Sequence, residues 1–216
     1  MKAKANNKAV WKKIKKNLVK TYDKYAKERT GGKQQVWKRR ERKEFLLYLE
    51  KEKKKTLLEI GAGTGVDSLY FQIHNLDVTA IDISPEMVRF CKKRGLRAFV
   101  LDFCYIHRLK KTYDAVYALN CLMHVPKADF ERLLKRIRTI LKPSGLFYLG
   151  MYGGNDFEGI LQDDYYEPKR FFSFYQTEDI LAIVQRNFKL EYFRHITPWK
   201  EGGTFQSMIL RKVRRR

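Results

Sequence analysis

A glycine-rich turn between an apolar run and a helical run is the feature of this sequence with the clearest chemical meaning. The run from Leu57 to Ile60 leads directly into Gly61-Ala62-Gly63-Thr64-Gly65. Glycine lets the backbone approach a ligand closely, and the N–H groups at the start of the following helix are free to bind it. Asp82 ends the next apolar run, where a carboxylate accepts the two hydroxyls of a ribose. We therefore predict a site for an adenosine-containing cofactor.

The spacing of these glycines distinguishes two classes of adenosine cofactor. Dinucleotide-binding turns carry G-x-G-x-x-G and hold a pyrophosphate at the helix N-terminus. Here the glycines stand at every second position, and Val66 occupies the place of the third glycine in the dinucleotide pattern. Glu59, just before the turn, suits a cationic group and repels a pyrophosphate. These features favour S-adenosylmethionine over a nicotinamide dinucleotide.

Residues 56 to about 155 resemble the class I S-adenosylmethionine-dependent methyltransferases through EIGAGTG, the acid in TAIDIS and the acid in LDF. The resemblance implies S-adenosylmethionine as cofactor and S-adenosylhomocysteine as product. It implies a cofactor site made of Gly61, Ala62, Gly63 and Gly65 along the methionine portion, Glu59 at its amino end, Asp82 on the ribose, Ile83 and Met87 beside the adenine, Asp102 on the exocyclic amine, and the Phe103 N–H on a ring nitrogen. For Asp102 the alternative is a turn residue that ends the third strand.

The end of the fourth apolar run supplies candidates for contact with the methyl donor or acceptor. The run from Tyr113 to Asn120 resembles the family's fourth strand, whose carboxyl end faces the sulfonium, so we expect Asn120, Cys121 and His124 there. Methyl transfer is an in-line displacement that needs positioning, no metal, and a base only where the acceptor loses a proton. His124 is the predicted base, because an unperturbed histidine titrates at about pH 6.5. The alternatives are a packing histidine and capping roles for Asn120 and Cys121.

Aromatic residues before and after the glycine turn are candidates for a lid and an acceptor pocket. By resemblance to small methyltransferases, Tyr22, Tyr25 and Trp37 on N-terminal helices are predicted to close over the cofactor. The alternative is that they are ordinary core aromatics. The predicted acceptor pocket is apolar with a few polar groups, and its candidate wall residues are Tyr152, Tyr165, Tyr166, Phe171, Phe172 and Tyr175. Packing of this segment against outer strands is the alternative.

The elements that must position these residues follow from hydrophobic periodicity. Short β-branched and aromatic runs predict strands over 56–60, 78–83, 98–101, 113–119, 146–152, 189–196 and 204–212. Helical periodicity predicts helices over 9–25, about 36–49, 66–74, 85–94, 127–141 and 177–187. Alternating strands and helices indicate an α/β fold, a doubly wound Rossmann-like sheet of about seven mostly parallel strands with an antiparallel C-terminal strand. We expect a basic helical lid over residues 1–55 and a methyltransferase domain over residues 56–216, together one domain.

The net charge of +22 lies mostly at the two ends of the chain. We expect the N-terminal lysines, including Lys12, Lys13, Lys15 and Lys16, to form a solvated helix face. Because the body is nearly neutral, we predict a small-molecule acceptor. The alternatives are an RNA or DNA methyltransferase that uses the basic ends, and a cofactor-binding module without catalysis.

Because the sequence has no apolar signal peptide and no apolar run long enough to span a membrane, we expect a cytoplasmic protein. A mitochondrial presequence is disfavoured, because the start is rich in lysine and lacks serine. The oligomeric state is not predicted.

Overall fold

The structure is a computed structural model that describes residues 2–31, 34–197 and 203–213. Its α-helices are α1 (Lys2–Lys24), α2 (Val36–Lys51), α3 (Val66–Ile73), α4 (Pro85–Lys93), α5 (Lys127–Ile140) and α6 (Thr177–Gln185). Its 3-10 helices are η1 (Glu28–Thr30), η2 (Phe103–Leu109) and η3 (Leu122–His124). Its strands are β1 (Thr56–Ile60), β2 (Asp77–Asp82), β3 (Ala98–Val100), β4 (Tyr113–Leu119), β5 (Leu141–Gly153), β6 (Phe157–Ile160), β7 (Phe171–Phe174), β8 (Lys189–Ile196) and β9 (Thr204–Arg211).

The main sheet has seven strands in the order β3-β2-β1-β4-β5-β9-β8. The pairs from β3 to β5 are parallel, whereas β9 is antiparallel to both β5 and β8. This confirms the predicted doubly wound sheet with an antiparallel C-terminal strand. That strand lies inside the sheet, between β5 and β8, because the hairpin folds back onto β5.

Two features of the strands differ from the sequence prediction. β5 begins at Leu141, directly after α5, and so includes the turn-like residues before Leu146 where the prediction began the strand. β6 and β7 pair antiparallel in a separate two-stranded sheet, which the sequence did not predict. Each of these strands has only four residues, and their pairing depends on a partner beyond a loop, so local periodicity carries little signal for them.

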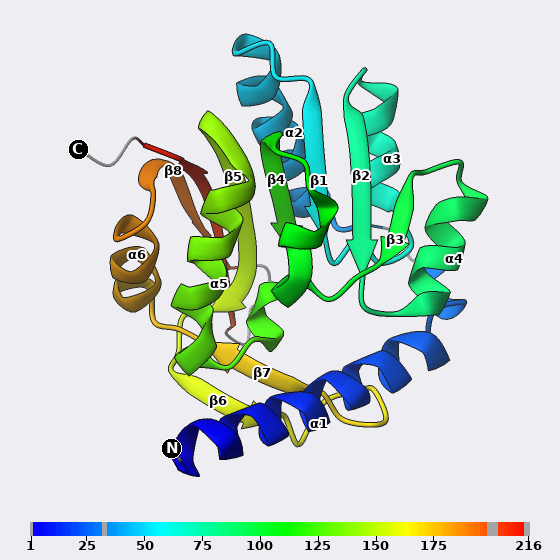
Figure 1. The fold of residues 1–216 in the computed structure, drawn as a ribbon, viewed down its shortest axis with the longest axis vertical. Coiled ribbons are helices and arrows are strands. Elements are labelled where there is room, and N and C mark those ends of the chain that lie inside the picture. The colour runs from blue at the N-terminus through cyan, green and yellow to red at the C-terminus, as the bar shows by residue number, and fades with distance from the viewer. Residues whose placement is uncertain (1, 32–33, 198–202, 214–216) are drawn as a thin grey trace.

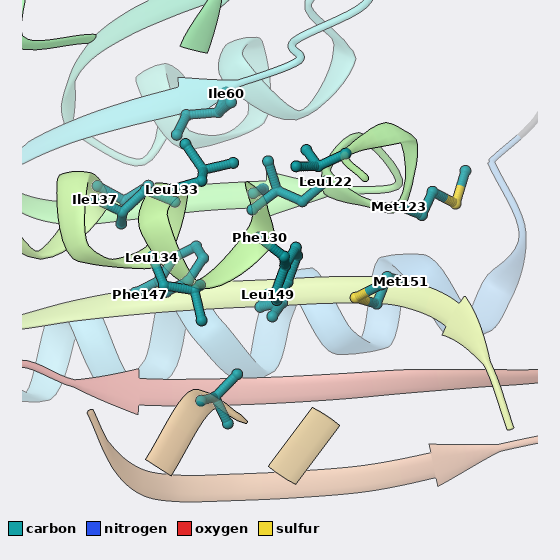
Figure 2. Close-up of a cluster of buried hydrophobic side chains, with 14 of the residues drawn as sticks. Ile60, Leu122, Met123, Phe130, Leu133, Leu134, Ile137, Phe147, Leu149 and Met151 are labelled. Atoms are coloured by element: carbon teal, nitrogen blue, oxygen red, sulfur yellow. The ribbon is translucent and has the colours of Figure 1, made fainter. Parts of the chain in front are cut away.

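Side chains on the two faces of the main sheet enter different parts of the core. Alternation along a strand sends Leu57 of β1 to the face covered by α2 and α3, and Leu58 to the face covered by α5 and α6. Figure 2 shows the second layer, in which Leu134 of α5 lies near Phe147 of β5, and Phe130 of α5 lies near Leu149. Because helices cover both faces of the sheet, a functional site is expected at the carboxyl ends of its strands.

Helix α1 and the β6–β7 sheet cross the edge of the main sheet at which the parallel strands end (Figure 1). Ile14 and Leu18 of α1 are buried, as the helical periodicity predicted, but Trp11 is buried in place of the predicted Val10, which is exposed, and the helix begins at Lys2. The expectation that Lys15 is solvated was wrong, because its side chain turns inward and forms an ion pair with Asp102 at 2.6 Å. No helix in the described part of the chain combines the length and apolar character needed to cross a lipid bilayer.

Candidate functional site

A pocket at the carboxyl edge of the sheet, called here the loop pocket, lies between the glycine turn and α1. From α1 and the segment after it, the wall contains Trp11, Lys15, Leu18, Tyr22 and Arg29. From the edge of the sheet it contains Ile60, Gly61, Gly63, Asp82, Ile83, Met87, Leu101, Phe103, Leu119, Asn120, Cys121 and His124. The structure thus brings together most of the cofactor residues proposed from the sequence, although they come from separate elements.

The glycine turn keeps the floor of the loop pocket close to the end of β4. Gly61 has a φ of +68°, and a Cβ there would lie 2.3 Å from the Cβ of Cys121, so only glycine fits. The Cys121 thiol donates to the Ile60 carbonyl at 3.0 Å, which joins the ends of β1 and β4. A Cβ on Gly63 would meet no atom within 4 Å. The turn is therefore packed on its sheet side and open on its pocket side.

Asp82, at the end of β2, is a buried carboxylate that is only partly satisfied by the protein. It accepts hydrogen bonds from the backbone N–H groups of Gly63 and Ser84, each at 2.9 Å. Burial raises the pKa of Asp82 to about 6, although these two bonds oppose the shift. A carboxylate has roughly four lone-pair sites, so Asp82 retains acceptor capacity toward the loop pocket.

A second group of charges lies on the other side of the glycine turn. Glu59, Asp67, Ala62, Gln34 and Lys38 line a depression that shares Arg29 and Asn120 with the loop pocket. Glu59 is buried and accepts a hydrogen bond from the Ser68 hydroxyl. Burial, followed by the nearby Asp67 charge, raises the pKa of Glu59 well above its usual value. A cation bound beside Glu59 would favour its charged form.

His124 is held in one tautomer by two hydrogen bonds. Nδ1 lies 2.7 Å from the carbonyl oxygen of Phe171, which can only accept, so Nδ1 carries the hydrogen. Nε2 is then the acceptor for the Tyr22 hydroxyl, also at 2.7 Å. Burial lowers the pKa of His124 to about 4, so the ring is neutral at neutral pH. His124 is therefore a proton acceptor whose lone pair faces Tyr22.

Several residues proposed from the sequence lie outside the loop pocket. Asp102 caps η2 by accepting from the Cys104 N–H at 2.8 Å, and its other oxygen binds Lys15. This placement matches the turn-residue alternative for Asp102. Tyr25 packs edge-on against Tyr166, with ring centroids 4.7 Å apart. Gly65 caps α3, and Trp37 packs against Phe205.

A second cavity, called here the aromatic cavity, adjoins the loop pocket and shares Tyr22, Arg29 and Asn120 with it. Its other wall residues are Lys38, Met123, Tyr152, Gly153, Gly154, Asn155, Leu161, Asp163, Tyr166, Arg170, Phe172, Phe174, Gly203 and Thr204. Of the predicted acceptor residues, this wall includes Tyr152, Tyr166 and Phe172.

The remaining aromatic candidates have other surroundings. Tyr165 is 75% exposed, whereas Phe171 and Tyr175 are buried in the core. Phe171 lines a small depression together with Val10 and Ile14 of α1, and its carbonyl orients His124. Tyr175 packs against Phe130 of α5, with ring centroids 5.2 Å apart. The aromatic segment is thus divided between cavity wall and core.

Asn120 stands at the junction of the two cavities. It has a φ of +55°, a conformation that few residues other than glycine adopt. Its N–H donates to the Gly150 carbonyl at 2.8 Å, which fixes the backbone turn at the end of β4. Its Oδ1 is buried without a hydrogen-bond partner among the described residues. Such an acceptor, next to a strained backbone, is typical of a ligand-binding position.

The cationic residues of this junction were not predicted from the sequence. Arg170 forms an ion pair with Asp164 at 2.6 Å and donates to the Tyr22 hydroxyl at 3.2 Å. Arg29 and Lys38 also reach the wall, from the segment after α1 and from α2. The position of Arg170 within a run of aromatic residues was the one feature of the sequence that could have indicated a cation at this site. Among the described residues, no three His, Cys, Asp or Glu side chains are grouped to hold a metal.

A family model described as "Methyltransferase domain" matches residues 33–192, more than half of the chain. The match confirms the resemblance predicted from the glycine turn and its acidic partners. The sequence also resembles the ubiquinone biosynthesis O-methyltransferase of Xanthomonas oryzae pv. oryzae, with 29% identity over 43% of this chain and 41% of that protein. It resembles phosphoethanolamine N-methyltransferase 3 of Arabidopsis thaliana, with 30% identity over 48% of this chain and 22% of that protein. The chain therefore spans less than half the length of these curated relatives.

Solved structures of methyltransferases share the fold. The 1,6-didemethyltoxoflavin-N1-methyltransferase of Burkholderia thailandensis has a TM-score of 0.62 and 20% identity, over 78% of this chain and 76% of that one. The N-methyltransferase NodS of Bradyrhizobium japonicum has a TM-score of 0.66 and 13% identity, over 89% of this chain and 98% of that one. Both were crystallised with S-adenosylhomocysteine.

Proposed function

We propose, because the chain belongs to the methyltransferase-domain family, that the protein transfers a methyl group from S-adenosylmethionine to a small molecule. The observation that carries this proposal is the junction between the two cavities. Tyr22, Arg29 and Asn120 line both, so a cofactor in the loop pocket and an acceptor in the aromatic cavity would meet there. Displacement at a methyl group requires two bound molecules held in line.

The residues of the loop pocket fit S-adenosylmethionine. Asp82 has acceptor capacity for the ribose hydroxyls, and Ile83 and Met87 offer apolar contact to an adenine ring. Glu59 and the unpartnered Oδ1 of Asn120 suit the cationic ammonium and sulfonium groups. When bound, this cofactor supplies an electrophilic methyl group to a nucleophile.

Tyr22 and His124 provide a path for a proton when the acceptor must lose one. The Tyr22 hydroxyl lies at the junction of the cavities and donates to Nε2 of His124. Uptake of a proton at the Tyr22 oxygen would be matched by transfer of its own proton to Nε2. Burial raises the pKa of Tyr22, but donation from Arg170 opposes this shift and favours the phenolate. His124 thus acts through Tyr22 in this proposal and does not touch the acceptor.

Residues 1–55 serve as the lid of the same domain in this proposal. Asp23, near the end of α1, accepts from the Ser84 hydroxyl at 2.5 Å and from the Glu86 N–H at 3.1 Å. On the other side, the Thr21 hydroxyl donates to the Pro168 carbonyl at 2.5 Å. These bonds attach α1 both to α4 beside the loop pocket and to the loop beside the aromatic cavity. The lid would therefore exclude water from both bound molecules.

A small-molecule acceptor is favoured over a nucleic acid by the lining of the site. Side chains from α1, β5 and β7 line the aromatic cavity, whereas the exposed lysines of α1, such as Lys12 and Lys16, are not part of its wall. The names of the two curated relatives describe methylation of oxygen in one case and nitrogen in the other, in each case on a small molecule. The acceptor atom here is left open. A cytoplasmic location stays a prediction from the sequence.

The proposal is tested by incubating the protein and radiolabelled S-adenosylmethionine with a cell extract divided into small molecules, RNA and DNA. We expect label in the small-molecule fraction, and a product that mass spectrometry shows to be heavier by one methylene unit. The Asp82→Ala variant should lower the labelling, whereas Asp77→Ala, at the exposed start of β2, should not. Label confined to RNA or DNA would contradict the proposal. Binding of the cofactor without any labelling would instead indicate a non-catalytic module.

A further inference from the structure

Two cations in the wall of the aromatic cavity have no carboxylate partner among the described residues. Lys38 Nζ lies 5.1 Å from the ring centroid of Trp37 and 5.6 Å from that of Tyr152, with no ion pair. Arg29 donates to the Tyr166 hydroxyl at 3.0 Å and lies over the rings of Tyr22 and Tyr166, and its charge also acts on Asp82 across the loop pocket without an ion pair. The two side chains therefore bring positive charge to one wall with no carboxylate in direct contact.

The other charged residues of the same cavity do not change this balance. Arg170 is neutralised by two hydrogen bonds from its guanidinium to the Asp164 carboxylate, at 2.6 and 2.9 Å. Asp163 also lines the cavity, but it is exposed to solvent and forms no ion pair with Lys38 or Arg29. The uncompensated charge of the described wall is therefore positive.

Lys38 is destabilised in its charged form by its surroundings. Burial, followed by the neighbouring Arg29 charge, lowers the pKa of Lys38 to about 8, whereas the Asp67 charge opposes the shift. Removing an ammonium group from water beside another cation is unfavourable unless an anion is paired with it. An anion bound in the aromatic cavity would supply that pairing.

We propose that the acceptor carries an anionic oxygen group, a carboxylate or a phosphate, which binds to Lys38 and Arg29 in the aromatic cavity. This inference rests on the proposed function, because it takes the aromatic cavity as the acceptor site. The group would anchor the acceptor at the Lys38 wall and leave its nucleophilic atom free to reach the junction at Asn120 and Tyr22. Charge-assisted hydrogen bonds to Lys and Arg are the usual means of such anchoring.

The cofactor alone does not account for both cations. S-adenosylmethionine has one carboxylate, and Arg29 is the cation that lines the loop pocket, the depression beside Glu59 and the aromatic cavity. Lys38 lines the depression and the aromatic cavity but not the loop pocket. With the cofactor carboxylate paired to Arg29, the Lys38 ammonium still lacks an anion. No described side chain pairs with it, and the acceptor is the source that we propose.

The test is a calorimetric titration of the protein, saturated with S-adenosylhomocysteine, with inorganic phosphate in one arm and benzoate in the other, at constant ionic strength. We expect at least one anion to bind, with a dissociation constant raised tenfold or more in Lys38→Gln and kept within threefold in Lys38→Arg. Lys43→Gln, an exposed position on the same helix, is the matched control and should match the wild type. The arm that binds identifies a phosphate or a carboxylate as the preferred group.

Two results would overturn the inference. One is that neither anion binds, or that binding is unchanged in Lys38→Gln. The other is that Lys38→Gln weakens S-adenosylhomocysteine binding tenfold while anion binding is unchanged, which would assign Lys38 to the cofactor carboxylate.

A second measurement separates failure of this inference from failure of the proposed function. The small-molecule extract is passed over an anion-exchange resin, and both fractions are incubated with the protein and labelled S-adenosylmethionine. We expect label in the retained, anionic fraction. Label only in the unretained fraction would overturn the anionic acceptor but support small-molecule methylation. Label that appears only in RNA or DNA would overturn the proposed function itself.

Discussion

The loop pocket and the aromatic cavity share a wall, but they are built in different ways. In the loop pocket, the polar groups are positioned by the backbone where adjacent strands end, as where Asp82 accepts hydrogen bonds from the N–H groups of Gly63 and Ser84. In the aromatic cavity, the wall is made of side chains that are far apart in the sequence, such as Lys38 and Arg170. The backbone geometry at the carboxyl ends of the strands tolerates few substitutions. Side chains on the β6–β7 sheet and on the lid can be replaced by other residue types without changing the fold. This difference suits a constant cofactor beside a variable acceptor.

The largest effect is expected from Gly61→Ala. The added Cβ would lie 2.3 Å from the Cβ of Cys121, and the positive φ would add strain of roughly 1–2 kcal/mol. We expect calorimetry to show S-adenosylhomocysteine binding weakened by about 100-fold or more. Gly95→Ala is the control, since its φ is +76° but its Cβ would meet no atom within 4 Å. Its binding should equal that of the wild type, and an unaffected Gly61→Ala would refute the packed turn.

Asp82→Ala should have the next largest effect. It removes the charged acceptor expected to hold the ribose hydroxyls, so S-adenosylhomocysteine binding should weaken by about 1.5–3 kcal/mol without unfolding. The matched control is Asp77→Ala, at the other end of β2, whose carboxylate pairs with Arg97 at the surface. Equal dissociation constants for Asp82→Ala and the wild type would place the ribose elsewhere.

The pH dependence of cofactor binding should follow Asp82. Burial raises its pKa to about 6 in the cofactor-free protein. Ribose hydroxyls donate hydrogen bonds to the carboxylate and therefore favour its ionised form. Below about pH 6 the Asp82 carboxyl is protonated, so cofactor binding must first remove that proton. The dissociation constant of S-adenosylhomocysteine should be constant above about pH 7 and rise toward tenfold per unit as the pH falls below 6. In Asp82→Asn the part of this rise centred at about pH 6 should be absent, leaving only the contribution of Glu59. Persistence of the step at pH 6 would exclude Asp82 as its titrating group.

The smallest effect is expected from the outer face of α1. Replacing the exposed Lys12, Lys13 and Lys16 by Gln should leave kcat/KM for a small-molecule acceptor within about twofold, because such surface charges act mainly on polyanions and are screened by salt. Lys15 is left intact because it is paired with Asp102. A large rise in KM that depends on salt concentration would favour a nucleic-acid acceptor.

The sequence predicted the loop pocket better than the aromatic cavity for a physical reason. The glycine turn, Asp82, Ile83 and Met87 follow strands whose hydrophobic pattern is strong, so their positions at the sheet edge follow from local sequence. The lid and acceptor aromatics were divided between wall and core, because their direction depends on packing between distant elements. Trp37, predicted over the cofactor, packs on Phe205 instead of lining the loop pocket.

Long-range contacts also explain what the sequence could not show about His124. An isolated histidine is a plausible base, and its position after β4 was predicted correctly. Its tautomer comes from Phe171 and Tyr22, which lie 47 and 102 residues away in the sequence. Its low pKa comes from burial among distant elements, and the Phe171 hydrogen bond opposes that shift. The same holds for Lys38, whose lack of a carboxylate partner among the described residues is visible only once β5 and α2 are placed together.

A crystal structure of the protein with S-adenosylhomocysteine tests most directly the assignment of one cavity to the cofactor and the other to the acceptor. We expect the adenosine in the loop pocket, with its ribose hydroxyls on Asp82 and its adenine between Ile83, Met87 and Phe103. The sulfur should face Asn120 and Tyr22, and the aromatic cavity should contain no part of the ligand. Density for the adenosine in the aromatic cavity, or a ribose away from Asp82, would contradict this assignment.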